Sequence, residues 1–272
     1  MRVGPPAPPH AMGRARMRKA VRTLQSRLPM LKSAKDEFYR HSRRLLRVPH
    51  EADFRALELF PDSLGGCYVD VGANHGQSIE SIRLFKPRAR IVSFEANPLL
   101  AERLQRRYAR SNEVSVVALG LADRADSFTL FVPSYGGFVY DGLASLDRDS
   151  AASWLGPGTI FGFDPARLAI AEIRCRVDTL DRHNLEPAFI KVDVQGFEYQ
   201  VLAGARATLA RCEPVLLVES FRDDPRLVRL MEDLGFAEFH YQDGRLRPGI
   251  SPRENSFLMT EARWRSLAQV RD

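Results

Sequence analysis

The sequence predicts an α/β fold of the Rossmann-like type. We expect a three-layer sandwich around a mainly parallel sheet, with an antiparallel C-terminal strand and a helical N-terminal extension. From residue 67 onward, short apolar runs of strand length alternate with segments of helical length. Glycines at positions 72 and 76 form a turn between the first strand and the first helix. Acidic residues directly follow several of the apolar runs, where the strands of such a sheet end.

Each element of this sheet follows from its local sequence. Helix 98–110 starts with Pro98, which the first turn of a helix tolerates because its N–H has no partner there. The run 128–132 is interpreted as an added strand, because its alternation is short and stops before Pro133. Strands are expected at residues 68–71, 90–94, 114–119, 128–132, 189–192, 215–218, 238–241 and 256–259. Helices are expected at residues 77–85, 98–110, 197–210 and 225–234.

The N-terminal part of the chain differs from the rest. Residues 1–13 are rich in Pro and Gly, and we expect them to be disordered. Residues 14–61 are predicted to form a basic helical extension, with helices at 14–31, 36–46 and 51–60. Apolar residues at spacings of three and four favour packing of the first helix on its own domain or on a second subunit. Its arginines leave open a peripheral contact with an anionic membrane surface or an acidic partner.

Composition limits the classes of function. The 272 residues, 44% of them apolar, suffice for one α/β domain, which we place at residues 62–272. Residues 1–50 hold 13 Lys and Arg against two acids, so the remaining chain is net negative and nucleic-acid binding is not expected. The three cysteines are far apart and lack metal-ligand spacing. Without a membrane-length apolar run or a secretory signal, a cytoplasmic protein with reduced thiols is expected.

The glycine turn is the most informative segment. It reads Gly72-x-Asn74-x-Gly76 and follows Asp70, near the end of the first strand. Glycines let the backbone approach a ligand closely, and the helix that follows offers free N–H groups. A dinucleotide fingerprint would need glycine at position 74, so a nicotinamide-dependent oxidoreductase is the less favoured alternative. Asp70 suits an ammonium group better than a phosphate, which indicates a cofactor with an amino-acid part.

Two further residues extend this cofactor site. Glu95 ends the second strand about 20 residues after the turn, where an acid can accept both ribose hydroxyls of an adenosyl ligand. Asn97 follows it and is also assigned to the cofactor. An amino-acid part and an adenosine part together predict S-adenosylmethionine as the cofactor.

A second pair of acids follows later strands. Asp193 and Glu219 each come directly after or at the end of a buried apolar run, and adjacent strand ends would bring them together. Such acids can bind substrate hydroxyls, act as a general base or hold a divalent cation. We expect Asp193 to be the base or to orient the substrate, with Glu219 and then His75 as the other candidates. No metal site is predicted, although a divalent cation stays an alternative.

These segments together resemble the FkbM family of methyltransferases. The similarity runs from about Asp62 to Met259 and is carried by VDVGANHG at 69–76, VDTLD at 177–181 and IKVDVQGFE at 190–198. The family usually has Glu where this chain has Gln195, and often Ala where it has Phe197. The missing charge at Gln195 weakens any role borrowed for that position. The resemblance implies a class I methyltransferase fold and assigns cofactor roles to Asp70, Gly72, Asn74, Gly76 and Glu95.

The resemblance also implies a function. The family mostly O-methylates sugars, polyketides and other secondary metabolites, so we expect a small-molecule or glycan hydroxyl as the acceptor. Residues 133–174, where glycines stand beside aromatic residues, are interpreted as a long irregular insertion on the substrate side. Packing of Trp154 and Phe161 on the core is the alternative. A non-catalytic adenosyl-binding scaffold, with the basic arm recruiting a partner, and a homodimer also stay open.

Overall fold

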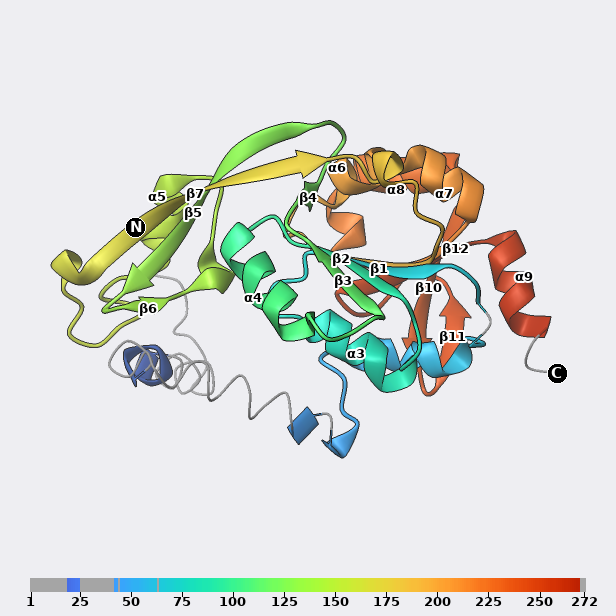
Figure 1. Cartoon of the computed structure of the whole chain (residues 1–272), viewed down its shortest axis with the longest axis horizontal. Helices are drawn as coiled ribbons and strands as arrows, with labels where there is room; N and C mark the ends of the chain where they lie inside the picture. Colours follow the sequence, from blue (N-terminus) through green and yellow to red (C-terminus); the bar gives the residue numbers. More distant parts are fainter. Residues whose placement is uncertain (1–18, 25–41, 44, 63, 270–272) are drawn as a thin grey trace, which may run out of the picture. The chain divides into compact units, whose positions relative to one another are not determined.

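The computed structural model describes residues 19–24, 42–43, 45–62 and 64–269 (Figure 1). The chain divides into two compact units. We call residues 41–127 and 175–272 the Rossmann unit, and residues 1–40 and 128–174 the insertion unit. The segment predicted to be disordered, residues 1–13, lies outside the described residues, as does most of the predicted helix 14–31. Its described part, residues 19–24, is helical.

The Rossmann unit is built on a sheet with eight described strands in the order β11-β10-β12-β9-β8-β1-β2-β3. From β3 to β9 every neighbouring pair is parallel. β12 lies antiparallel to both β9 and β10, and β11 is antiparallel to β10. The strands are β1 (Cys67–Val71), β2 (Ile91–Phe94), β3 (Val114–Val117), β8 (Pro187–Val192), β9 (Val215–Glu219), β10 (Phe236–Gln242), β11 (Arg245–Pro248) and β12 (Asn255–Thr260). The predicted fold class, including the antiparallel C-terminal strand, is confirmed.

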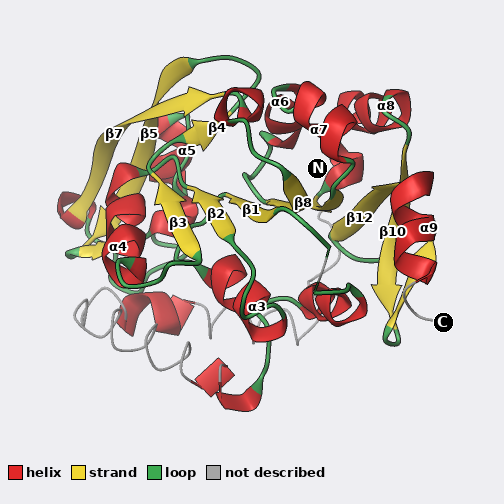
Figure 2. Ribbon diagram, turned by 45° about the vertical axis from the view of Figure 1, so that its right-hand side comes forward, coloured by secondary structure: helices red, strands yellow, loops and turns green. Residues whose placement is uncertain are grey.

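Helices cover both faces of this sheet, as Figure 2 shows for α3 on one side and α6, α7 and α8 on the other. The helices are η1 (Ala52–Leu59, a 3-10 helix), α3 (Gln77–Phe85), α4 (Pro98–Tyr108), η4 (Leu180–His183, 3-10), α6 (Glu198–Ala203), α7 (Arg206–Cys212), η5 (Phe221–Asp223, 3-10), α8 (Pro225–Asp233) and α9 (Glu261–Gln269). The predicted helices 77–85, 98–110 and 225–234 are present, and segment 51–60 forms the 3-10 helix η1.

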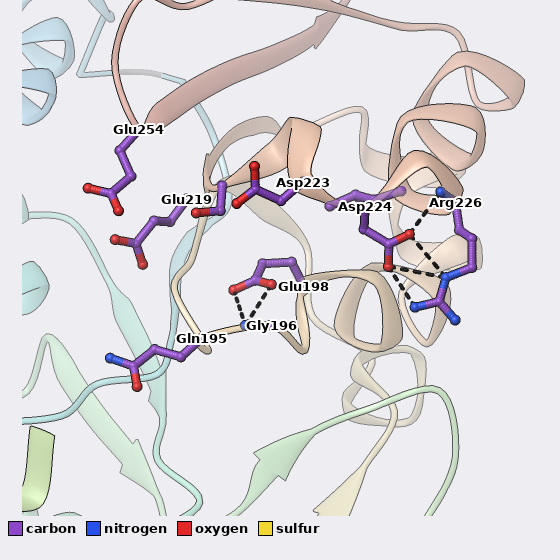
Figure 3. A pocket seen from close by; sticks show the side chains of 10 residues that line it. Gln195, Gly196, Glu198, Glu219, Asp223, Asp224, Arg226 and Glu254 are labelled. Carbon is purple, nitrogen blue, oxygen red and sulfur yellow. Dashed lines mark hydrogen bonds and ion pairs between the residues drawn. The ribbon is translucent and has the colours of Figure 1, made fainter. Parts of the chain in front are cut away.

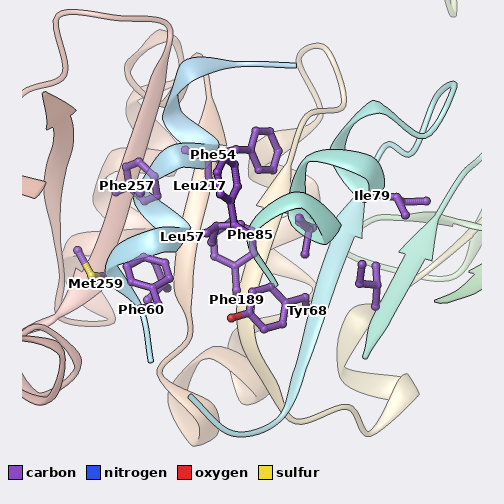
Figure 4. Packing of buried hydrophobic residues seen from close by; sticks show 14 of the residues in the cluster. Phe54, Leu57, Phe60, Tyr68, Ile79, Phe85, Phe189, Leu217, Phe257 and Met259 are labelled. Atoms are coloured by element: carbon purple, nitrogen blue, oxygen red, sulfur yellow. The ribbon is translucent and has the colours of Figure 1, made fainter. Parts of the chain in front are cut away.

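Two separate apolar cores result from the alternation of side chains along the strands. In β1, Tyr68 belongs to the core under η1 and α3, while Val69 belongs to the core under α6, α7 and α8. In β8, Phe189 and Ile190 divide in the same way. Figure 4 shows the first core, where Phe54 and Leu57 of η1 pack with Phe189 and are fully buried. The strands are therefore apolar on both faces, as parallel strands between two helical layers must be.

The predicted single helix 197–210 is wrong, because the structure divides it into α6 and α7 at Gly204 and Ala205. A Cβ added at Gly204 would lie 1.9 Å from the carbonyl oxygen of Ala122. The backbone of the neighbouring segment therefore occupies the space that any side chain at this position would need. The periodicity of the apolar residues continues across the break, so it could not reveal this close approach.

The insertion unit is regular rather than irregular, which corrects the expectation for residues 133–174. It contains β6 (Phe138–Val139), α5 (Arg148–Ser153), η2 (Asp141–Leu143, 3-10) and η3 (Pro165–Arg167, 3-10). β5 (Asp126–Tyr135) leads into the unit and β7 (Leu168–Asp178) leads out of it. β7 ends in the Rossmann unit, where Val177 and Asp178 pair with β4 (Gly120–Leu121). β7 was not expected from the sequence, because all of its residues except Cys175 and Val177 are exposed or half-buried.

The helical residues 19–24 belong to the insertion unit and are bonded to it. Lys19 Nζ donates to the carbonyl of Pro157 (2.6 Å). Thr23 Oγ1 accepts from the backbone N–H of Phe161 (2.9 Å), and Tyr140 donates its hydroxyl to the carbonyl of Arg22 (3.0 Å). This part of the N-terminal arm therefore packs on its own chain. Among the described residues, no helix combines the length and apolar character needed to cross a membrane.

Candidate active site

The glycine turn follows β1 and is held by the backbone around it. The N–H groups of Gly72 and Ala73 both donate to the carbonyl of Phe94 in β2 (3.0 and 3.1 Å). Gly72 has φ +89°, and a Cβ there would lie 1.9 Å from the carbonyl oxygen of Asp193. Only glycine permits both this left-handed conformation and this contact. The turn is thus locked between the ends of β2 and β8.

Asn74, His75 and Gly76 complete the turn. Asn74 also has a positive φ (48°), and its side-chain Oδ1 is buried without a hydrogen-bond partner. Gly76 (φ 85°) precedes α3. His75 is fixed through its backbone, because its N–H donates to Gln77 Oε1 (3.1 Å) and its carbonyl accepts from Arg107 (2.6 Å). The structure places His75 in the glycine turn, and its catalytic role stays a prediction.

Asp70 is fully buried beside this turn. Its Oδ2 accepts a hydrogen bond from Ser93 Oγ (2.7 Å), but its Oδ1 has no partner among the described residues. Loss of water around the carboxyl raises the pKa of Asp70 to about 7, although the Ser93 hydrogen bond and the charge of Lys191 lower it. Asp70 is therefore a buried acceptor with an open oxygen, which is costly unless a donor reaches it.

Glu95 connects the second strand to the glycine turn. Its Oε2 accepts from the N–H of Asn74 (2.7 Å), and its Oε1 accepts from the N–H of Asn97 (2.8 Å). These bonds bring the two predicted halves of the cofactor site together. Asn97 caps α4, since its Oδ1 accepts from the N–H of Leu99 (3.0 Å). Capping accounts for Asn97 in the structure, and its cofactor contact stays a prediction.

The second predicted pair, Asp193 and Glu219, also comes together at adjacent strand ends, because β8 and β9 are parallel neighbours. The two carboxyl groups are hydrogen-bonded to each other. This bond, burial and the charge of Asp193 raise the pKa of Glu219 to about 8, while the charge of Lys191 lowers it. At neutral pH Glu219 is therefore mainly protonated, beside Asp193. We call Asp193 and Glu219 the carboxyl pair.

A row of polar side chains crosses the same face of the sheet near these strand ends. Asp70 is the register partner of Lys191, and Glu219 is the register partner of Asn255. Each lies two residues from a member of the first core, and alternation places it on the same face. The sequence analysis named Asp70 and Glu219 but missed Lys191 and Asn255. A lysine inside a buried apolar strand is the sequence signal that could have identified Lys191.

An open pocket of about 500 Å³ lies beside the carboxyl pair, within the Rossmann unit. Glu219, Glu254 and Gln195 face it in Figure 3, and Glu198 holds the loop below by accepting from the N–H of Gly196. Two of its residues, Gln195 and Ser220, have positive φ without being glycine (52° and 51°). The pocket is lined by Gln195, Gly196, Glu198, Glu219, Ser220, Asp223, Asp224, Arg226, Leu227 and Glu254.

The pocket is lined mainly by acidic residues, and most of its charged side chains form hydrogen bonds or ion pairs with neighbouring residues. Arg226 is paired with Asp224, whose carboxylate also caps α8. Glu198 is used by the backbone of the loop before α6. Glu219 belongs to the carboxyl pair, and its pKa is raised. In the described part of the chain, no group of three or more His, Cys, Asp or Glu residues has an arrangement suited to a metal ion.

Comparison with known proteins relates this arrangement to a family. The family model for the methyltransferase FkbM domain matches residues 70–237. The AMB antimetabolite synthetase AmbE of Pseudomonas aeruginosa is 30% identical over 236 residues. That match covers 74% of this chain, which spans only 11% of the length of that protein.

Among solved structures, an FkbM methyltransferase of Methylobacillus flagellatus is 17% identical, with a TM-score of 0.47. That match covers 77% of this chain and 48% of the other. A SAM-dependent O-methyltransferase of Thermotoga maritima is 10% identical, with a TM-score of 0.35, and the match covers 76% and 62% of the two chains. The family match covers more than half of the chain and includes Asp70, Glu95 and the carboxyl pair. The chain belongs to the FkbM family of methyltransferases.

Proposed function

We propose that this methyltransferase transfers the methyl group of S-adenosylmethionine to a hydroxyl group of a sugar, polysaccharide or secondary metabolite. One observation carries the cofactor assignment. Asp70 Oδ1, just before the glycine turn, and Asn74 Oδ1, within it, are both buried without partners among the described residues. Buried acceptors of this kind need donors. The ammonium and ribose hydroxyl groups of S-adenosylmethionine are such donors.

The residues present fit this cofactor. Asp70 provides a carboxylate oxygen for the ammonium group. Glu95 accepts backbone hydrogen bonds through both oxygens, and a carboxylate oxygen can accept more than one, so Glu95 suits the ribose hydroxyls. Asn74 has a Cβ at the position where a dinucleotide site requires glycine. S-adenosylmethionine supplies an activated methyl group, so the protein has to align the acceptor and remove one proton.

Glu219 is the group that takes this proton. It lines the pocket where we place the acceptor, and its pKa is raised by a hydrogen bond with Asp193. With S-adenosylmethionine bound as the methyl donor, the carboxyl pair would take the proton that the acceptor hydroxyl loses on methylation. Because the pKa of Glu219 is about 8, the pair becomes fully ionised and most basic above this pH. The rate of methyl transfer is therefore expected to rise as pH increases through about 8.

Two observations support the acceptor class. The pocket presents carboxylates and one amide, which suit hydroxyl donors. The related AmbE is an antimetabolite synthetase, which favours a secondary metabolite over a structural glycan. An acceptor with several hydroxyl groups would use Glu254 and Gln195 for orientation and Glu219 for chemistry.

Calorimetry with purified protein tests the cofactor. We expect binding of S-adenosylmethionine and S-adenosylhomocysteine and no binding of NAD. Binding of NAD alone would contradict the proposal. The matched variants are Asp70→Asn, which should weaken both adenosyl ligands, and Asp62→Asn, an acid in the same unit outside the glycine turn, which should not.

Methyl transfer to mixed glycan and natural-product acceptors tests the base. Asp193→Asn keeps the shape of the side chain but removes its charge, so the pKa of Glu219 falls and Glu219 becomes a weaker base. The rate should drop by roughly 10²-fold or more, and its rise with pH should move to lower pH. A chelator should leave the rate unchanged. A rate that survives both Asp193→Asn and Glu219→Gln would remove the pair from the mechanism.

A further inference from the structure

Lys191 is a buried cation that the mechanism above does not use. Its side chain is 0% exposed, one residue before the end of β8. Its ammonium nitrogen donates to Asn255 Oδ1 (3.0 Å) and lies 3.5 Å from Glu51 Oε2 and 3.9 Å from Asp193 Oδ2. Burying an ammonium group is costly even when it is paired. Phe189, two residues earlier in β8, and Leu217, the register partner of Lys191 on β9, are both apolar. Packing alone therefore does not require a lysine here.

The position of Lys191 connects the two halves of the site. On β1, its register partner is Asp70, the carboxyl with the open oxygen in the cofactor region. Asp193, one member of the carboxyl pair, follows Lys191 by two residues along the same strand direction. The charge of Lys191 lowers the pKa of both Asp70 and Glu219. The ammonium group of Lys191 therefore acts both on Asp70, in the cofactor region, and on Glu219, the proposed base.

Side chains from two segments that are far apart in the sequence hold Lys191 in place. Asn255 Nδ2 donates to Glu51 Oε2 (2.9 Å) and to Asp53 Oδ2 (3.3 Å), and Asp53 is paired with Arg253 (3.1 Å). These residues come from the start of η1 and from the segment entering β12. The Lys191 ammonium group is thus held by a network of side chains that belong neither to the glycine turn nor to the lining of the pocket.

We propose that Lys191 is a positioning residue, which holds the negative charge on Asp193 beside Glu219 and couples the carboxyl pair to Asp70. The role assigned to Glu219 rests on the proposed function, whereas the coupling itself does not. The other charged groups facing the carboxyl pair are Glu254, from the segment before β12, and His50, from the segment before η1, which interacts with Asp193 and Lys191. Glu95 faces Asp70 from β2.

Carboxyl ¹³C NMR on the full chain tests the coupling without any acceptor. In the unsubstituted protein, Glu219 should titrate at about pH 8 and Asp70 at about pH 7. Lys191→Met and Lys191→Gln both remove the charge, and Lys191→Gln keeps a donor for Asn255. Each should move both midpoints upward, by about 1–3 pH units as expected for the loss of a charge at close range. Lys191→Arg should leave them near their original values.

Lys86→Met provides the matched control. Lys86 is also a buried lysine (7% exposed), bonded to Asp62 and to the carbonyl of Phe60, away from the carboxyl pair. Its loss should reduce stability but leave both midpoints unchanged. Midpoints that stay unchanged in both Lys191 variants would show that Lys191 only fastens η1 to the sheet, and would overturn the proposal.

A measurement on the unsubstituted protein covers the case in which neither variant folds. The side-chain ¹⁵N resonance of Lys191 should show a step at about pH 8, when Glu219 loses its proton. A resonance that is flat across this range overturns the proposal. Calorimetry with S-adenosylmethionine separates the two claims. Failure of the unsubstituted protein to bind it would refute the proposed function and leave the coupling intact, whereas binding with unmoved midpoints would refute the coupling alone.

Discussion

The buried carboxyl of Asp70 is suited to bind a ligand, but its burial lowers the stability of the folded protein when the carboxyl is ionised. Its pKa is raised from 3.8 to about 7 because the folded chain removes water from it. A carboxyl whose folded pKa exceeds its unfolded pKa stabilises the protein fully below pH 4, and this stability is lost as pH rises through 7. Above pH 7 the buried charge has only the Ser93 hydroxyl and the nearby Lys191 to compensate it.

Asp70→Asn should therefore separate stability from binding. At pH 8 we expect the variant to be more stable than the original protein by about 1–3 kcal/mol, since an unpaired charged acceptor is removed. At pH 4 the two stabilities should converge. Urea unfolding at both pH values measures this, and calorimetry at pH 8 should show weaker S-adenosylmethionine binding. Equal stability at pH 8 would show that the carboxylate is compensated within the folded chain.

Glu95 combines a structural and a binding role. Glu95→Ala removes the acceptor of the Asn74 and Asn97 N–H groups as well as the proposed ribose contact. We expect S-adenosylmethionine affinity to fall by about 1–3 kcal/mol, the usual cost of losing a charged hydrogen-bond partner. Glu95→Gln keeps the shape and one acceptor oxygen, so it should lose less. An unchanged dissociation constant for Glu95→Ala would exclude Glu95 from the site.

At the scale of elements, the turn after β1 depends on a contact that no single element contains. A Cβ at Gly72 would lie 1.9 Å from the carbonyl oxygen of Asp193, directly after β8, whereas a Cβ at Gly65, with a similar φ of +75°, would meet nothing within 4 Å. The two glycines therefore form a natural comparison. Both carry the cost of a left-handed backbone if substituted, but only Gly72 carries the clash.

Gly65→Ala should cost about 1 kcal/mol, the penalty of a left-handed conformation for a residue with a Cβ. Gly72→Ala should cost several times as much, because its Cβ would have to displace the Asp193 carbonyl, and the strand ends that hold Asp70 and Asp193 would separate. Chemical denaturation compares the two, and calorimetry follows S-adenosylmethionine. Similar losses in both variants would contradict the contact.

The break between α6 and α7 shows the limit of reading elements from sequence. Helical periodicity extends through residues 197–210, but a helix needs its backbone to be free of neighbours as well as amphipathic. At Gly204 the carbonyl of Ala122 leaves no room for a Cβ. Glycine in a helical pattern signals such an approach only weakly, because it is also tolerated in uninterrupted helices.

At the scale of the whole molecule, the N-terminal arm divides between the two units. Residues 19–24 bond to the insertion unit, while Glu51 and η1 belong to the Rossmann unit. Every residue assigned to the cofactor lies between positions 70 and 97. Cofactor binding should therefore depend on η1 and be independent of the residues before it.

A chain starting at Glu51 should bind S-adenosylmethionine within a few-fold of the full chain, as calorimetry would show. A chain starting at residue 61 loses η1, whose Phe54 and Leu57 are fully buried, and should not fold. Insolubility of the first truncation would show that residues 1–50 belong to the core or to an obligatory subunit interface.

The alternation of strands and helices, the glycine turn and the acids at strand ends were predictable from the sequence. Each rests on local rules, because side-chain period, turn chemistry and the end of an apolar run lie within a few residues of one another. The family resemblance rested on the same local motifs, and the family match confirms it. The roles of the individual site residues stay predictions.

Tertiary structure decided which of these residues meet. β8 lies between β1 and β9, so Lys191 is the register partner of Asp70, while Asp193, directly after β8, comes next to Glu219 at the end of β9. Neighbours in a parallel sheet come from distant parts of the chain, and no local pattern specifies their order. Burial is likewise a property of the packed molecule. The pKa values of Asp70 and Glu219 are raised because the fold brings Glu219 against Asp193 and removes water from both Asp70 and Glu219.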